Sequence, residues 1–178
     1  YKRQYQKVPT NITEQYAKAC LKLGLIYQDQ EKLDKAANIF SKVPKHIPEH
    51  YALGQFSLGI VYDMQGNLAK AITAWQNVPE SVTESYAWAQ YHLGIALYET
   101  QGQLDKIIKA WKNVPESVTE PYGLAQFNLG AVYEEQGQIN QAIEIFENIP
   151  KDSQEAYDLA QLNLQRIYQE QNEQILPS

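Results

Sequence analysis

The sequence predicts an all-α protein made of about four stacked helix pairs and a terminal helix. Three observations predict this fold class. A Leu-Gly pair recurs in phase through the chain, ten of the thirteen tyrosines fall on two phases of the same period, and no unit shows the alternation of a strand. A Val-Pro or Ile-Pro pair also returns at intervals of 35, 35, 36 and 35 residues, at Val8-Pro9, Val43-Pro44, Val78-Pro79, Val114-Pro115 and Ile149-Pro150.

Each unit opens with a first helix of about 18 residues. In the third unit Tyr86, Ala89, Leu93 and Tyr98 mark one apolar face at helical spacing. A serine or aspartate three residues before a glutamate is typical of a capping box at a helix start. The pattern predicts such boxes at Ser81/Glu84, Ser117/Glu120 and Asp152/Glu155.

A short polar turn and a second helix complete each unit. In the second unit the turn 65–67 contains a glycine suited to a helix C-terminus. Leu68, Ala71 and Trp75 then follow at helical spacing, and the recurring proline ends the helix because it forces the preceding residue out of the α region. We expect Gly59 and Ala71 to lie where the two helices approach closely, since a larger side chain there would separate them.

The repeat divides the chain, 1–178, into parts of one solenoid domain. Residues 1–9 align with the end of a second helix, which predicts the tail of a preceding repeat. Residues 151–178 supply one first helix and predict a terminal or capping helix with a tail. The complete repeats between these two ends are predicted at 10–44, 45–79, 80–115 and 116–150.

The third unit contains one extra residue. Twelve steps separate Tyr86 from Tyr98, whereas the other units have eleven steps between the matching tyrosines. Eleven residues make about three helical turns, so a twelfth would turn Tyr98 away from the shared face. We expect a π-type bulge within Gly94–Tyr98 to absorb the insertion. Such a bulge is consistent with a functional site or with a compensated insertion.

The order of small and aromatic residues in each unit resembles the tetratricopeptide repeat. The resemblance implies a right-handed α-α superhelix whose first helices line a concave groove, and a function in protein–protein interaction. It covers nearly the whole chain. In the second unit the residues that carry it are Leu58, Gly59, Tyr62, Gly66, Ala71 and Trp75.

The resemblance also implies which side chains face a ligand in the groove. Aromatic residues at these positions favour binding, because they bury large areas at little entropic cost. Trp88 stands out, since its in-phase counterparts Lys18 and Leu53 show that packing does not require an aromatic ring there. These side chains either anchor a partner or pack between adjacent helices. The candidate groove residues are Leu53, Phe56, Ile60, Trp88, Tyr91, His92, Ile95, Leu124, Phe127 and Asn128.

Motifs of enzymes and cofactor sites are missing from the sequence. It has no phosphate-binding loop, no His-Glu-x-x-His and no Gly-x-Ser-x-Gly. We therefore expect no enzyme, no catalytic residues and no cofactor. His46 and His50 are four residues apart but have no third ligand, so no metal site is expected. The only cysteine, Cys20, excludes an internal disulfide framework and favours the cytoplasm, although the compartment stays open.

The charge of the chain excludes some partners and varies along the array. A net charge of −6 argues against nucleic acid, and no apolar run is long enough for membrane insertion. Residues 1–9 carry +3, the unit 116–150 carries −6, and 151–178 carries −3. This gradient would permit weak head-to-tail association between copies. The excess of Lys over Arg is typical of a bacterial genome with low GC content.

The leading interpretation is a module that binds a peptide or helix of a partner protein in an apolar, aromatic-lined groove. The alternative is a structural or self-associating scaffold that uses its graded charged ends. A further alternative is an accessory region of a larger protein whose activity lies outside this sequence.

Overall fold

The computed structural model describes residues 10–175, and the tail predicted at 1–9 lies outside them. The described part contains helices and no strand, which confirms the predicted all-α repeat fold. Helix pairs fall within each of the four units, and a long single helix follows them. The helices are α1 Thr10–Asp29, α2 Leu33–Phe40, α3 Pro48–Met64, α4 Leu68–Gln76, α5 Thr83–Glu99, α6 Leu104–Lys112, α7 Thr119–Glu135, α8 Ile139–Glu147 and α9 Gln154–Ile175.

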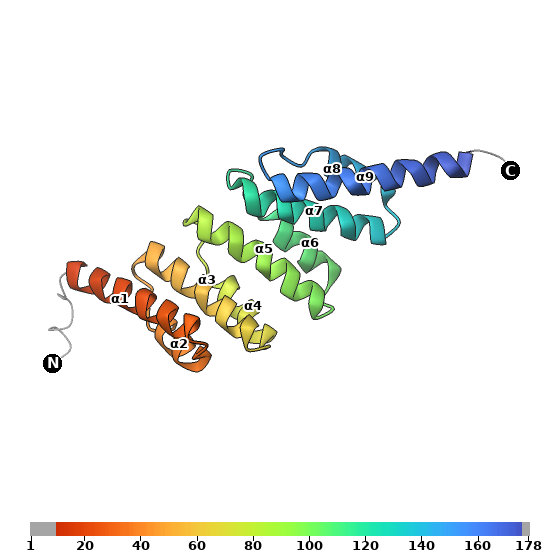
Figure 1. The fold of residues 1–178 in the computed structure, drawn as a ribbon. Helices are drawn as coiled ribbons and strands as arrows, with labels where there is room; N and C mark the ends of the chain where they lie inside the picture. Colours follow the sequence, from red (N-terminus) through yellow and green to blue (C-terminus); the bar gives the residue numbers. More distant parts are fainter. Residues whose placement is uncertain (1–9, 176–178) are drawn as a thin grey trace.

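The first helices of the units form a continuous row. Helices α1, α3, α5, α7 and α9 follow one another along the array, with α1 and α9 at its two ends (Figure 1). Each first helix contacts the next one, whereas α2, α4, α6 and α8 make no contact with one another within residues 10–175. The array is therefore curved with the first helices on its inner side. We call the surface formed by α1, α3, α5, α7 and α9 the inner face.

Glycines bring the two helices of each pair together. A Cβ atom on Gly59 would lie 2.2 Å from Nε1 of Trp75, and one on Gly94 would lie 2.2 Å from Nε1 of Trp111. Ala71 is fully buried in the same contact layer. The predicted close approach at Gly59 and Ala71 is thus confirmed. The large ring of each second helix fills the space that the missing Cβ leaves.

The predicted π-type bulge within Gly94–Tyr98 is wrong. Helix α5 is a regular α-helix of 17 residues, the same length as α3 and α7. The extra residue lies in the next turn, where four residues separate α5 from α6 and three separate the helices of the second and fourth units. The turn absorbs the insertion because an added turn residue breaks no helical hydrogen bond.

The residue at the left-handed position of each turn shows where the insertion lies. Gly66 and Gly137 have φ of 69° and 73°, but in the third unit Gln101 takes this position with φ of 52°. The backbone N–H of Gly102 then donates to Leu97 O at 2.7 Å, as Asn67 N–H donates to Tyr62 O in the second unit. Leu97 is therefore the counterpart of Tyr62, and Tyr98 lies one residue further along the helix.

The predicted capping boxes are also absent from the structure. Helix α5 starts at Thr83 and is preceded by Val82, which offers no side-chain cap, and Val118 precedes α7 in the same way. Val82 N–H donates to Pro79 O at 3.1 Å, so Ser81 lies inside a turn. Because of the turn after the recurring proline, the N-cap lies one residue after the serine that the Ser-x-x-Glu spacing selects.

Candidate functional site

Four aromatic side chains from α3 and α5 gather on the inner face. Phe56 comes from α3, and Trp88, Tyr91 and His92 come from α5. The His92 ring lies between the others, with centroid distances of 5.8 Å to Phe56, 6.2 Å to Trp88 and 5.2 Å to Tyr91. The Trp88 and Tyr91 rings meet edge to face at 6.0 Å. All four side chains are half-buried. We call these four residues the aromatic cluster.

A buried tryptophan of α4 packs against this cluster. The rings of Trp75 and His92 stack with centroids 5.4 Å apart and planes 21° apart, and Trp75 is only 1% exposed. Its equivalent in the third unit, Trp111, donates from Nε1 to Tyr91 O at 3.2 Å. Both tryptophans therefore fix the segment of α5 that carries the cluster. Residue spacing predicts only a packing role for Trp75 within its own helix pair, because spacing within one unit does not reveal a contact between units.

The position of His92 alters its acidity. Burial among the rings lowers the pKa of the His92 imidazole, and the carboxylate of Asp63 opposes this shift in part. At neutral pH the ring is consequently neutral and suited to apolar stacking.

We expect the stability of the fold to fall as pH drops below the ordinary histidine pKa of about 6.5. His92 has a lowered pKa in the folded state, so the unfolded chain binds the proton first. The neutral ring makes its full contribution to the free energy of unfolding above that value. The loss grows as the pH falls and stops growing below the lowered pKa of the folded state. Urea unfolding at several pH values should show this loss in the wild type and a smaller loss in His92→Gln. His46→Gln is the control, because His46 is exposed, and an equal effect of both substitutions would contradict the assignment.

Four of the other candidates pack mainly against the core. Each is partly buried against a group of buried residues, and Phe127 lies on the ring of Phe146 at 5.8 Å. The structure therefore separates Phe127 from the aromatic cluster. The four side chains are Ile60, Ile95, Leu124 and Phe127.

The last two candidates lie on either side of the cluster. The side chain of Asn128 on α7 interacts with the Tyr91 hydroxyl and offsets part of the rise in the Tyr91 pKa that burial causes. Leu53 is 42% exposed and lines a separate, nearly apolar hollow of about 350 Å³ between α1 and α3. Lys18, Lys22 and Glu49 line the same hollow, and Lys18 pairs with Glu14, so charges of both signs surround it.

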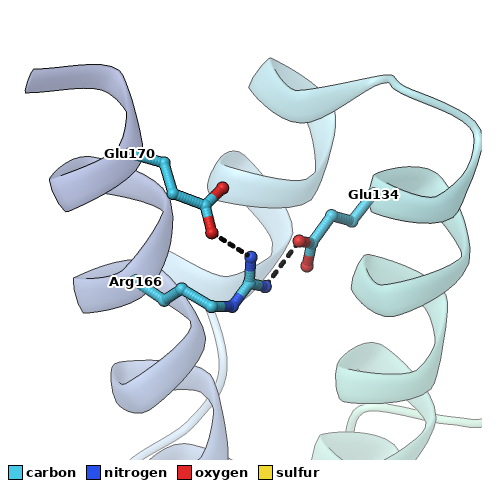
Figure 2. Close-up of polar contacts among 3 residues, drawn as sticks. All are labelled: Glu134, Arg166 and Glu170. Carbon is cyan, nitrogen blue, oxygen red and sulfur yellow. Dashed lines mark hydrogen bonds and ion pairs between the residues drawn. The ribbon is translucent and has the colours of Figure 1, made fainter. Parts of the chain in front are cut away.

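An arginine at the other end of the inner face is held between two carboxylates. Arg166 of α9 pairs with Glu134 of α7 and with Glu170 one helical turn further along α9 (Figure 2). The two glutamates raise the pKa of the guanidinium. The ion pair ties α9 to α7 across their interface. Within residues 13–173 no three His, Cys, Asp or Glu side chains gather in a way that could hold a metal ion.

Comparisons with known proteins agree with this architecture. Tetratricopeptide-repeat family models match residues 17–43 and 124–156. These two segments of the chain are therefore similar to the tetratricopeptide repeat. No curated protein sequence matches it significantly. Tetratricopeptide arrays generally mediate protein–protein interactions and are typically not enzymes, which agrees with the coarse function that the sequence predicts.

Two solved structures of MamA are similar to this helical array. One has a TM-score of 0.60 and 24% identity, over 84% of this chain and 81% of MamA. The other has a TM-score of 0.58 and 27% identity, over 80% of this chain and 73% of that one. This likeness supports the helical-repeat fold. Among helices of residues 10–175, none has the length and apolar character needed to cross a bilayer.

Proposed function

We propose that this tetratricopeptide array binds a peptide or helix of a partner protein on its inner face, with the aromatic cluster as the anchor. The observation that carries the proposal is the meeting of Phe56, Trp88, Tyr91 and His92 in one half-buried patch across α3 and α5. Aromatic side chains that are rigidly held and partly exposed are typical of the residues that dominate binding energy.

The immediate surroundings of the cluster favour an apolar ligand group. The pKa of His92 is lowered, so the imidazole is neutral at pH 7, and the phenol of Tyr91 remains protonated because burial raises its pKa. A ligand side chain placed on the cluster therefore meets rings and no formal charge. Polar contacts with the partner would come from Asn128 and from Lys22 on the neighbouring first helices.

We expect the double substitution Trp88→Ala/Tyr91→Ala to weaken partner binding by about 10²- to 10³-fold, because each aromatic anchor contributes about 2 kcal/mol. Affinity capture from native lysate would identify the partner, and titration with that partner would give the affinity. Trp88 fluorescence should change on binding, since Trp88 is half-buried while Trp75 and Trp111 are buried.

The control is Tyr16→Ala/Tyr168→Ala, which removes two exposed tyrosines at the ends of the array, far from the cluster along the row of first helices. Equal affinity for the wild type and the Trp88→Ala/Tyr91→Ala protein, with both folded, would place the partner elsewhere. Circular dichroism of each variant establishes folding.

The graded charge supports a second candidate function, a scaffold in which copies stack end to end. The unit 116–150 contains six glutamates and no Lys or Arg, whereas 1–9 contains three basic residues and no acid. Electrostatic stacking of this kind weakens with salt. Sedimentation at low and high salt separates the two candidates, because salt-sensitive oligomers support the scaffold and a monomer at both concentrations removes it.

A further inference from the structure

A second surface feature lies at the turn that carries the insertion. The end of α5, the start of α6 and the end of α7 enclose a cleft of about 520 Å³. Its floor is apolar, formed by Ile107 and Val132, which are buried, and by Leu104. Tyr98, Glu99 and Glu135 also line it. The cleft therefore combines an apolar base with an aromatic ring and two carboxylates.

The one-residue insertion accounts for the position of Tyr98 in this cleft. Leu97 fills the core position that tyrosine holds in the neighbouring units. Tyr98 is consequently 45% exposed, and its hydroxyl donates to both carboxylate oxygens of Glu135 at 3.0 and 3.1 Å. This bond holds the phenol and the carboxylate together at the cleft.

Three of the four tyrosines that share the sequence phase of Tyr98 have a lysine over the ring. Lys35 lies over Tyr27 at 5.8 Å, Lys70 over Tyr62 at 5.4 Å, and Lys112 over Tyr133 at 5.9 Å from nitrogen to ring centroid. No such cation from the described part of the chain lies over Tyr98. Tyrosine rings of this phase can thus hold a cation, and within residues 13–173 no lysine or arginine lies over the rings of Tyr98 and Tyr168.

The carboxylates beside Tyr98 are also without a cation. Glu134, the neighbour of Glu135, is paired with Arg166 (Figure 2). Glu99 and Glu135 form no ion pair with any residue of the described chain, and both are exposed. Two negative charges thus flank an apolar cleft. A positive group that enters the cleft would be attracted by both carboxylates.

We propose that this cleft binds an arginine side chain of a partner protein. The aliphatic part of the arginine lies on Leu104, Ile107 and Val132, and the planar guanidinium stacks on Tyr98 while it donates to Glu135 and Glu99. Arginine suits this arrangement better than lysine, because its flat, delocalised cation both stacks and forms paired hydrogen bonds with carboxylates. The cleft shares no lining residue with the aromatic cluster, and the proposal holds whether or not that cluster binds a partner.

The test uses N-acetyl-arginine-N-methylamide as the probe and ¹H–¹⁵N NMR of the whole chain as the readout. The backbone amide of Gly102, which lines the cleft, should shift in a saturable way as the probe is added. The amides of Gly66 and Gly137, in the turns of normal length, should not shift. The matching citrulline amide, which has the same shape without the charge, should bind at least about tenfold more weakly, as should the lysine amide.

Two substitutions with the same change in charge separate a specific site from general attraction. Glu135→Gln should weaken binding of the arginine probe by about tenfold. Glu144→Gln, on the exposed side of α8, should leave the affinity for the probe nearly unchanged. Deleting Gln103 returns the third unit to 35 residues and should abolish binding, with folding followed by circular dichroism. The proposal is overturned by any of these results: no saturable shift at Gly102, equal binding of the citrulline or lysine amide, or equal effects of the two glutamine substitutions.

Discussion

We expect Trp75→Ala to lower the free energy of unfolding by about 3–5 kcal/mol, the usual cost of truncating a large buried ring. Trp75 is 1% exposed, fills the space beside Gly59 and stacks on His92, so its loss leaves a cavity between the second and third units. Urea unfolding monitored by circular dichroism measures the change. The same substitution removes the support of the aromatic cluster, so a folded Trp75→Ala protein should also bind the inner-face partner more weakly.

Trp88→Ala is the matched control for this effect. It removes the same side chain from a half-buried position, so the loss of stability should be clearly smaller. Similar losses of stability for both tryptophans would contradict the assignment of Trp75 as the core residue and Trp88 as the surface anchor.

We expect Gly59→Ala to cost about 1–3 kcal/mol, although alanine is the better helix former by about 1 kcal/mol. The new Cβ would lie 2.2 Å from Nε1 of Trp75, and the buried indole has no space into which to retreat. The cost should disappear when Trp75 is already alanine, because the ring that the methyl group meets is gone. A double-mutant cycle of the two sites should therefore show a coupling of about 2 kcal/mol or more.

Gly66→Ala provides the comparison for that cycle. No atom lies within 4 Å of a Cβ on Gly66, and its φ of 69° leaves backbone strain of about 1 kcal/mol as the only cost. This cost should be the same with and without Trp75. Strictly additive effects of Gly59→Ala and Trp75→Ala would show that the two helices move apart to accommodate the methyl group.

Residue spacing was sufficient to predict the architecture, because each unit repeats the same small and large residues at the same helical positions. Leu-Gly, the turn glycine and the ring of the second helix correctly indicated helix pairs in close contact at Gly59. The location of the insertion was not predictable from spacing. Counting from Tyr86 to Tyr98 assumes that tyrosine keeps its structural place, and the structure instead gives that place to Leu97.

The candidate site was predictable only in part, for a similar reason. Helical spacing correctly places Phe56, Trp88, Tyr91 and His92 on partly exposed surfaces of first helices. Spacing carries no information on contacts between units, so it did not indicate that His92 stacks on Trp75 of the preceding unit or that Phe127 rests on Phe146. Spacing therefore predicts positions on the first helices and leaves unresolved which of their side chains meet, so the candidate binding residues remain a prediction.

The absence of contacts between α2, α4, α6 and α8 within the described chain has a mechanical consequence. Each unit contacts only its neighbours, because both of its helices pack on the first helix of the next unit, so the array behaves as a series of blocks. Small rotations at successive joints add up, and the second helices can separate or approach without breaking a contact between one another, while each stays packed on the next first helix. A ligand bridging α3 and α5 would clamp one joint and leave the remaining joints elastic. Under tension the molecule should stretch as a soft spring whose stiffness rises locally where a partner is bound.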